Sequence, residues 1–166
     1  MPLSTGIETD ISEKYSVSVV IPARNESGNI VNAILWTPKL GKHTEIIFIE
    51  GNSTDDTWDT IQKIAEKYKD THDIKIGRQT GKGKGDAVRM GFGMANGDIL
   101  LILDADLTMP PEDLPKFYNA IASGRGDFIN GSRLVYVMEK KAMRFLNILG
   151  NKFLQNATGV VLQKMN

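Results

Sequence analysis

The chain has 166 residues, 41% of them hydrophobic and 24% charged, which is typical of a globular domain with a sizeable core. Its 20 basic and 20 acidic residues balance, so no bulk positive charge points to nucleic acid as a partner. There is no cysteine, which excludes disulfides and thiolate metal sites. No apolar run approaches the roughly 20 residues that span a bilayer, and the acidic N-terminus does not resemble a signal peptide. We therefore expect a cytoplasmic chain, either soluble or peripherally attached to the cytoplasmic membrane face.

Short apolar segments alternate along the chain with amphipathic ones, a pattern that predicts strands alternating with helices. Strands are predicted over residues 16–21, 45–50, 74–76, 98–103 and 127–130. Helices are predicted over residues 30–36, 55–68, 86–95, 111–123 and 139–155. Residues 1–15 are polar and rich in turn formers, so we interpret them as a lead-in or linker before one domain of residues 16–166. Right-handed crossovers then predict a Rossmann-like α/β fold, with a mainly parallel sheet and helices on both faces.

The fourth predicted strand ends in a pair of acids. Residues 99–103 are all apolar, which predicts a strand buried on both faces, and Asp104 and Asp106 follow with Ala105 between them. Alternation along an extended chain would point both carboxylates to one side, at the sheet edge where α/β proteins bind ligands. Hard oxygen ligands there suit Mg²⁺ or Mn²⁺ carrying a substrate phosphate. The alternative is a solvated strand exit without a metal.

Residues 81–85 read Gly-Lys-Gly-Lys-Gly and precede a predicted helix. Glycines let backbone N–H groups approach an anion closely, and a helix N-terminus favours negative charge. Lys82 and Lys84 would add cations. The spacing matches neither a P-loop nor a dinucleotide-binding fingerprint. We interpret this segment as a phosphate-binding loop, with a flexible basic loop as the alternative.

Polar side chains also follow other predicted strands. Asn25 and Glu26 follow the first strand, whereas Glu50 ends the second and Asn52 follows it. These residues suit either capping and turn formation or contacts with a nucleoside. Arg133 follows the fifth strand, where a guanidinium is either an ordinary surface group or a bidentate phosphate ligand. Because parallel strands end at one edge of a sheet, these groups are expected to converge there.

The two histidines and residues 139–154 are also considered as functional groups. Neither His43 nor His72 has a partner at metal-ligand spacing, so we expect both to be solvated and no histidine to be catalytic. Residues 139–154 combine four basic residues with seven large apolar ones. That mixture predicts either an ordinary packing helix or an interfacial helix on a membrane surface.

Five segments in chain order resemble the signature of the family 2 glycosyltransferases, and they are residues 19–26, 50–57, 81–85, 104–107 and 131–133. The chain is most similar to dolichol-phosphate-mannose-synthase-like enzymes and other polyprenyl-phosphate glycosyltransferases. This resemblance implies a GT-A fold that binds a GDP- or UDP-linked sugar. It also implies that Asp104 and Asp106 hold Mg²⁺ or Mn²⁺ on the donor diphosphate.

The resemblance implies roles for individual residues. The expected catalytic residues are Asp104, Asp106 and Arg133, with Arg133 on a donor or acceptor phosphate. The expected substrate-binding residues are Pro22, Ala23, Asn25, Glu26, Glu50, Asn52, Lys82, Lys84 and Ala105. The residues after the first strand would lie along the nucleoside, and those around the second strand end would lie near the base.

The family transfers a hexosyl group with inversion from a nucleotide diphosphate to an acceptor, here expected to be a polyprenyl phosphate at a membrane surface. The chain departs from the family in three ways, one of which is Thr108, where close relatives often carry Gln. Residues 50–53 read Glu-Gly-Asn-Ser instead of the usual Asp-Asp-x-Ser, which leaves the base open. Segments that close the acceptor side normally follow the equivalent of Asn166, so we expect a truncated chain. The alternatives are a nucleotide-sugar-binding module without turnover and a sugar nucleotidyltransferase.

Overall fold

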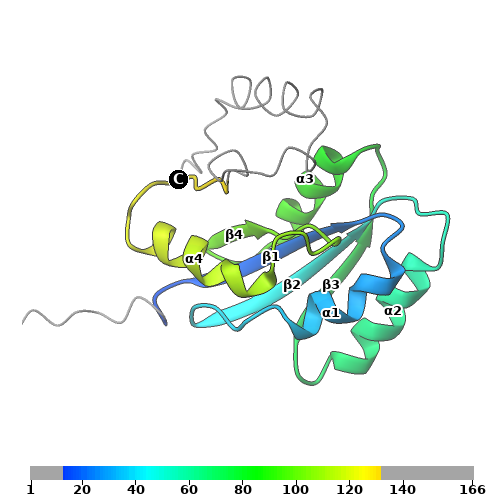
Figure 1. Cartoon of the computed structure of the whole chain (residues 1–166), viewed down its shortest axis with the longest axis horizontal. Helices are drawn as coiled ribbons and strands as arrows, with labels where there is room; N and C mark the ends of the chain where they lie inside the picture. The colour runs from blue at the N-terminus through cyan, green and yellow to red at the C-terminus, as the bar shows by residue number, and fades with distance from the viewer. Residues whose placement is uncertain (1–12, 132–166) are drawn as a thin grey trace, which may run out of the picture. The chain divides into compact units, whose positions relative to one another are not determined.

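The computed structural model describes residues 13–131, which carry a four-stranded parallel sheet with helices on both faces (Figure 1). The strands, in the spatial order β3-β2-β1-β4, are β1 (Ser16–Ala23), β2 (His43–Glu50), β3 (Asp73–Arg78) and β4 (Ile99–Ile102). The α-helices are α1 (Ile30–Leu35), α2 (Thr57–Tyr68), α3 (Lys84–Met94) and α4 (Leu114–Ala122). Short 3₁₀ helices precede α1 at Ser27–Asn29 and α4 at Pro111–Asp113. The predicted α/β class with a parallel central sheet is confirmed.

Successive side chains along each strand point to opposite faces of the sheet, so each face has its own hydrophobic core. In the larger core, apolar side chains of the sheet pack with α1, α2 and α4, among them Val19, Ile21, Phe48, Ile34, Ile61 and Leu114. On the other face, Val20, Ile47 and Ile49 pack against Ala87 of α3. A Cβ on Gly91 of α3 would come within 2.3 Å of Val20, so only glycine lets α3 lie this close to β1.

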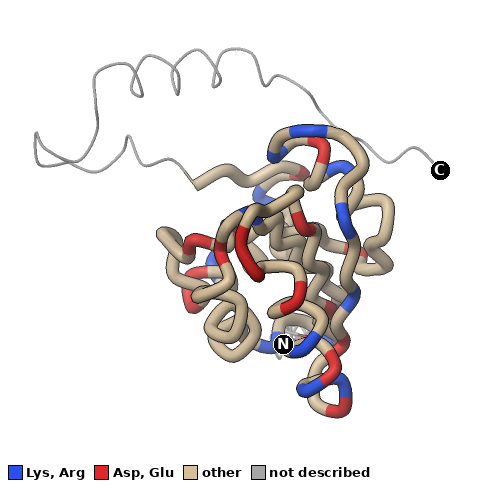
Figure 2. The backbone as a smooth tube through the Cα atoms, turned by 90° about the vertical axis from the view of Figure 1, so that its right-hand side faces the viewer, with Lys and Arg blue, Asp and Glu red and all other residues tan. Residues whose placement is uncertain are grey.

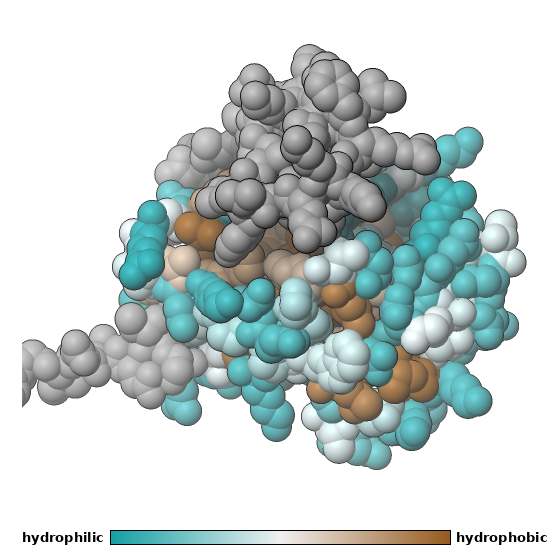
Figure 3. All heavy atoms as spheres, viewed as in Figure 1, coloured by the Kyte–Doolittle hydropathy of each residue, from teal (hydrophilic) through white to brown (hydrophobic). Residues whose placement is uncertain are grey.

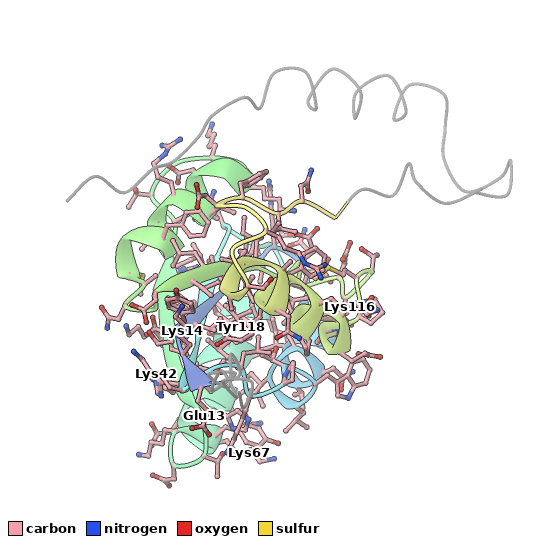
Figure 4. The ribbon with its side chains drawn as sticks, turned by 90° about the vertical axis from the view of Figure 1, so that its left-hand side faces the viewer. Glu13, Lys14, Lys42, Lys67, Lys116 and Tyr118 are labelled. Carbon is pink, nitrogen blue, oxygen red and sulfur yellow. The ribbon has the colours of Figure 1, made fainter. Side chains whose placement is uncertain are left out.

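At the amino end of the sheet, Tyr118 of α4 and the residues before β2 hold the start of β1. The backbone N–H of Tyr15 donates a 3.5 Å hydrogen bond to the Tyr118 hydroxyl, and the N–H of Lys42 donates to the carbonyl of Tyr15. Figure 4 looks onto this end and labels Tyr118 and Lys42. These contacts anchor the start of β1 and leave the carboxyl ends of the strands at the opposite edge.

β4 is an edge strand of the described sheet, and only one of its faces is buried. Ile99 and Leu101 are buried, whereas Leu100 and Ile102 are 39% and 42% exposed. Ile102 pairs in register with Val20, so its side chain points to the face of the sheet that carries α3. α3 lies mainly over β1 and β2 and therefore leaves this face of β4 uncovered. The prediction of a strand buried on both faces was wrong, because an apolar run does not reveal which of its residues lie beneath a helix.

Residues 126–131 belong to a second unit of the chain and contain no strand. Phe128 is 73% exposed. The strand predicted over residues 127–130 was therefore wrong, because a strand is held by ladder hydrogen bonds and this segment makes none within the described residues. Arg133 and the helix predicted over residues 139–155 lie outside the described residues.

The described surface in Figure 3 is mostly hydrophilic, with smaller apolar areas in brown. The large hydrophobic residues exposed on the described part of the chain are Leu35, Trp36, Leu100, Ile102 and Phe128. Within residues 13–131, no helix has both the length and the apolar character needed to cross a membrane.

A buried polar cluster lies beneath the carboxyl end of α3. Glu45 is 2% exposed, and its Oε1 accepts hydrogen bonds from Ser18 Oγ and the Asn96 N–H, while its Oε2 lies 2.6 Å from Lys75 Nζ. Burial raises the pKa of the Glu45 carboxyl, but the contacts with Lys75, Ser18 and Asn96 outweigh it and lower the pKa overall. The cluster joins the three strands β1, β2 and β3 to the turn before β4.

We expect Glu45→Gln to lower the free energy of unfolding by about 2 kcal/mol, because Lys75 loses its carboxylate partner in a buried setting. The folded-state pKa of Glu45 lies below its ordinary value of 4.5, so this advantage of the wild type is present above that pH. It is lost as the pH falls through the folded-state pKa. Urea denaturation of both proteins at about pH 7 and about pH 3 measures the difference.

The matched control is Glu66→Gln, which removes one partner of the exposed Lys69–Glu66 pair. Its expected cost is below about 0.5 kcal/mol at either pH. Equal losses for the two variants would contradict a special contribution of the buried cluster.

Candidate active site

The carboxyl ends of β1, β2 and β4 and the start of α3 surround a cavity of about 270 Å³. Figure 2 views the molecule from this side, where acidic and basic segments lie close to one another. The predicted site residues that line the cavity are Pro22, Ala23, Glu26, Lys84, Asp104, Ala105 and Asp106. Four other predicted residues, Asn25, Glu50, Asn52 and Lys82, are not among its lining residues.

Asp104 and Asp106 are presented by a turn that follows β4. The Leu107 N–H donates a 3.0 Å hydrogen bond to the Asp104 carbonyl, and Leu107 has a left-handed φ of 52°. Asp106 Oδ1 accepts hydrogen bonds from the N–H and hydroxyl of Thr108, both at 3.0 Å. Ala105 is 3% exposed and packs into the larger core. The predicted extended alternation was wrong, because the chain turns before Asp106, yet both acids line the cavity.

The start of α3 borders the same cavity. Lys84 is the first residue of α3, and its ammonium forms an ion pair with Asp104 Oδ1. Gly83 precedes it with a φ of 83°, a left-handed conformation that glycine adopts without strain. The N-terminus of α3 therefore adds partial positive charge to that of Lys84 beside the acids. Lys82 is exposed outside the cavity.

Asn25 joins the loop after β1 to the loop after β2. Its N–H donates to Ser53 Oγ at 3.0 Å, and its Oδ1 accepts a 2.9 Å hydrogen bond from the Thr54 N–H. A second link is the 2.9 Å hydrogen bond from the Glu26 N–H to Thr57 Oγ1. The N-cap residue of the short helix that follows is Glu26, and the Asn25 side chain bonds instead to the loop after β2. Its observed contacts hold one wall of the cavity in shape.

Glu50 is fully buried, and its carboxylate organises the turn after β2. Its oxygens accept hydrogen bonds from the Ser53 N–H and, at 3.0 Å, from Arg78 Nε. The Arg78 guanidinium lies 5.0 Å from the centre of the Trp58 ring. Burial raises the pKa of Glu50, but the hydrogen bonds from Ser53 and Arg78 outweigh it and lower the pKa overall. Asn52, in the same turn, is exposed and left-handed, with a φ of 57°.

Sequence reasoning missed several residues that line the cavity, namely Arg24, Ile49, Gly51, Gln79, Gly83 and Ala87. Arg24 matters most, because it brings a second permanent positive charge to the site. Its place between predicted residues of the first turn was a usable signal. Gln79 lines the cavity because it follows β3, which pairs with β2. The Gln79 N–H donates a 2.9 Å hydrogen bond to the Glu50 carbonyl.

No histidine lines the cavity within the described part of the chain. His43 Nε2 lies 2.9 Å from Asp73 Oδ2, and His72 Nδ1 lies 2.9 Å from the Thr71 hydroxyl. The His43 side chain is 57% exposed, in keeping with the expected solvation. Both histidines lie near the amino ends of β2 and β3, at the opposite end of the strands from Asp104 and Asp106.

The acids of the cavity fit a divalent ion that arrives with a substrate. Within residues 13–131, no three acidic, histidine or cysteine side chains form a cluster that could hold a metal alone. Asp104 and Asp106 provide hard oxygens, the ligand type that Mg²⁺ and Mn²⁺ prefer, and phosphate or water oxygens would supply the remaining ligands. The ion pair with Lys84 shows that Asp104 already attracts a cation.

Comparisons with known sequences agree on one protein family. The profile described as glycosyl transferase family 2 matches residues 18–162. A dolichol-phosphate mannosyltransferase of Pyrococcus furiosus is 38% identical over 122 residues, covering 72% of this chain and 33% of that protein. An undecaprenyl-phosphate 4-deoxy-4-formamido-L-arabinose transferase of Shewanella sediminis is 30% identical, covering 87% of this chain and 44% of that protein. The chain thus spans less than half the length of either relative.

Solved structures give the same fold. A mannosyltransferase of Pyrobaculum calidifontis, in complex with GDP-Man and Mn²⁺, matches with a TM-score of 0.56 and 26% identity, over 68% of this chain and 33% of that one. Glucosyl-3-phosphoglycerate synthase of M. tuberculosis matches with a TM-score of 0.55 and 27% identity, over 69% of this chain and 43% of that one. These likenesses confirm the expected GT-A fold.

The left-handed conformation of Asn25 generates a stability prediction. Both Asn25→Ala and Asn25→Gly remove the hydrogen bond from Thr54, but only alanine is strained at a φ of 55°. We expect Asn25→Gly to be more stable than Asn25→Ala by about 1 kcal/mol in urea denaturation.

The control is the same pair of substitutions at Gln62, an exposed position inside α2. At that position we expect the free energy of unfolding of the glycine variant to be about 1 kcal/mol lower than that of the alanine variant, because glycine destabilises a helix interior. The prediction fails if glycine is the less stable residue at both positions.

Proposed function

Because the chain belongs to glycosyl transferase family 2, we propose that it carries the donor site of a metal-dependent, inverting glycosyltransferase. The proposed reaction transfers a hexosyl group from a GDP- or UDP-linked sugar to a polyprenyl phosphate. One observation carries the proposal: three carboxylates, two cations and a helix N-terminus face the same cavity at the carboxyl edge of a parallel sheet. This is the place and the charge pattern that a nucleotide diphosphate with its metal requires.

The donor is supported by the groups around the cavity. Lys84, Arg24 and the N-terminus of α3 suit the diphosphate, whereas Pro22, Glu26 and Gly51 form the wall available to the nucleoside. The Pyrobaculum mannosyltransferase was solved with GDP-Man and Mn²⁺, and the mycobacterial synthase with UDP-Glc and Mn²⁺. These complexes support a GDP- or UDP-linked donor.

The proposed chemistry needs charge neutralisation and positioning. Bound at Asp104 and Asp106, a divalent ion would assist departure of the diphosphate. The acceptor oxygen forms a bond to the sugar C1 while the bond from C1 to the diphosphate oxygen breaks on the opposite face. The electron pair of that bond leaves with the nucleotide, and Lys84 and Arg24 stabilise its charge. A phosphate acceptor is already ionised near neutral pH, so a strong general base is not required.

The acceptor class is supported by the names of the relatives, which are a dolichol-phosphate and an undecaprenyl-phosphate transferase. A polyprenyl phosphate presents its headgroup at a membrane surface, so we place the reaction at the cytoplasmic membrane face. Attachment through residues 139–154 is part of this proposal, and those residues lie outside the described structure. Arg133, also outside it, is proposed as a phosphate contact.

The second candidate is a nucleotide-sugar-binding module without turnover. The cavity offers groups for a nucleotide diphosphate, and binding of that ligand does not by itself require turnover. A sugar nucleotidyltransferase is disfavoured, since the basic glycine loop follows β3 rather than β1. Transfer of labelled sugar to a polyprenyl phosphate separates the first two candidates.

We expect calorimetric titration with GDP and with UDP, each with and without Mn²⁺, to show binding of one nucleotide that Mn²⁺ strengthens. Asp106→Ala is expected to weaken the Mn²⁺-dependent part at least about tenfold, because a metal ligand is lost. Asp113→Ala, at a partly exposed acid that is the N-cap residue of α4, is the control and should bind as the wild type does.

Absence of nucleotide binding by the folded wild-type chain would contradict the donor site. Full Mn²⁺-dependent binding by Asp106→Ala would instead contradict the metal role of this acid.

A further inference from the structure

Asp104 is a proposed metal ligand, yet it is already paired within the protein. The Lys84 ammonium contacts its Oδ1, and the two side chains are 59% and 37% exposed. The companion acid, Asp106, is held differently, by the N–H and hydroxyl of Thr108 on a single oxygen. A metal approaching the pair therefore finds a neutral partner on Asp106 and a positive charge on Asp104.

Lys84 and a divalent ion cannot both occupy Asp104 favourably. Two cations within a few ångströms of each other repel, and each would weaken the attraction of the carboxylate for the other. Lys82 does not share this position, because it does not line the cavity. Lys84 is thus the cation in residues 81–85 that is placed to compete with a metal.

A diphosphate would offer Lys84 a second partner. Lys84 opens α3, at a helix N-terminus that borders the cavity and favours anions. Its flexible stem and three donors let the ammonium move from one anionic oxygen to another without moving the helix. If the Lys84 ammonium left Asp104 for a phosphate oxygen, the Asp104 carboxylate would become free to bind a metal. The phosphate oxygens that the metal also needs as ligands would arrive at the same time.

We propose that Lys84 is an internal counter-ion of Asp104, which the donor diphosphate draws away so that donor binding opens the metal site. The inference rests on the proposed donor and metal site, and adds a coupling between the two ligands. Coupling is reciprocal, so the metal also strengthens donor binding by keeping Lys84 on the phosphate.

The first test measures Mn²⁺ affinity without nucleotide, by the electron paramagnetic resonance signal of free Mn²⁺. Lys84→Met is expected to bind Mn²⁺ about two- to fivefold more tightly than the wild type, the range set by an exposed ion pair. Lys84→Arg keeps the charge and should remain near the wild-type affinity. A merely structural role of Lys84 would not tighten metal binding.

The matched control is Lys116→Met. Lys116 of α4, labelled in Figure 4, forms an ion pair of similar exposure with Asp113, the N-cap residue of that helix; the two side chains are 76% and 36% exposed. This variant loses the same net charge and an equivalent pair away from the cavity. Its Mn²⁺ affinity should equal that of the wild type, which separates local competition from a general charge effect.

The second test repeats the Mn²⁺ titration with GDP or UDP, whichever the wild type binds. The ratio of Mn²⁺ dissociation constants without and with nucleotide should be smaller for Lys84→Met than for the wild type. Without metal, the same variant should bind the nucleotide more weakly, since a phosphate contact is lost. Opposite changes for metal alone and nucleotide alone are the signature of the proposal.

Two results would overturn the inference in distinguishable ways. If Lys84→Met binds Mn²⁺ no more tightly than the wild type, while Asp104→Asn binds it more weakly, the counter-ion role is wrong and the metal site stands. If Asp104→Asn binds Mn²⁺ as the wild type does, the proposed metal site is itself wrong. Circular dichroism and thermal unfolding confirm that each variant is folded before it is titrated.

Discussion

The parallel pairing of β1 with both of its neighbours is the constraint on which the rest of the structure depends. β1 lies in register with β2 along its whole length and with β4 from Val17 to Val20. Because these strands run in one direction, the turns after β1, β2 and β4 meet at one edge. The crossover through α3 brings its N-terminus to the same edge. The cavity is therefore a consequence of strand direction, and its chemistry depends on the residues in those turns.

The turns themselves share an unusual backbone feature. Asn25, Asn52 and Leu107 follow three different strands, and each has a positive φ although none is glycine. Such conformations cost free energy and persist where surrounding contacts hold them. Hydrogen bonds between the loops after β1 and β2 provide that support at Asn25, and the buried Glu50 carboxylate braces the turn at Asn52. These contacts support the turns that border the cavity.

The charges that face the cavity are two cations, Arg24 and Lys84, and three carboxylates, Glu26, Asp104 and Asp106. This near balance suits a ligand that brings charges of both signs better than it suits a bare anion. A nucleotide diphosphate sugar with a divalent ion is such a ligand, since the metal offsets the charge of the diphosphate. An ion pair across the cavity, between Lys84 and Asp104, is the internal counterpart of that neutralisation.

The sequence by itself determined the α/β class, the order of the elements and the strand ends that carry polar groups, because periodicity and composition are local properties. It also singled out both acids and Lys84, which the structure places on the wall of one cavity. Only the tertiary structure decided which side chains face the cavity and which build its walls. Asn25 bonds to the loop after β2, and Glu50 bonds to its own turn and to Arg78 of β3. β4 buries one face alone, and residues 127–130 form no strand. The physical reason is that orientation, burial and ladder pairing depend on neighbours distant in the chain, which no local pattern records.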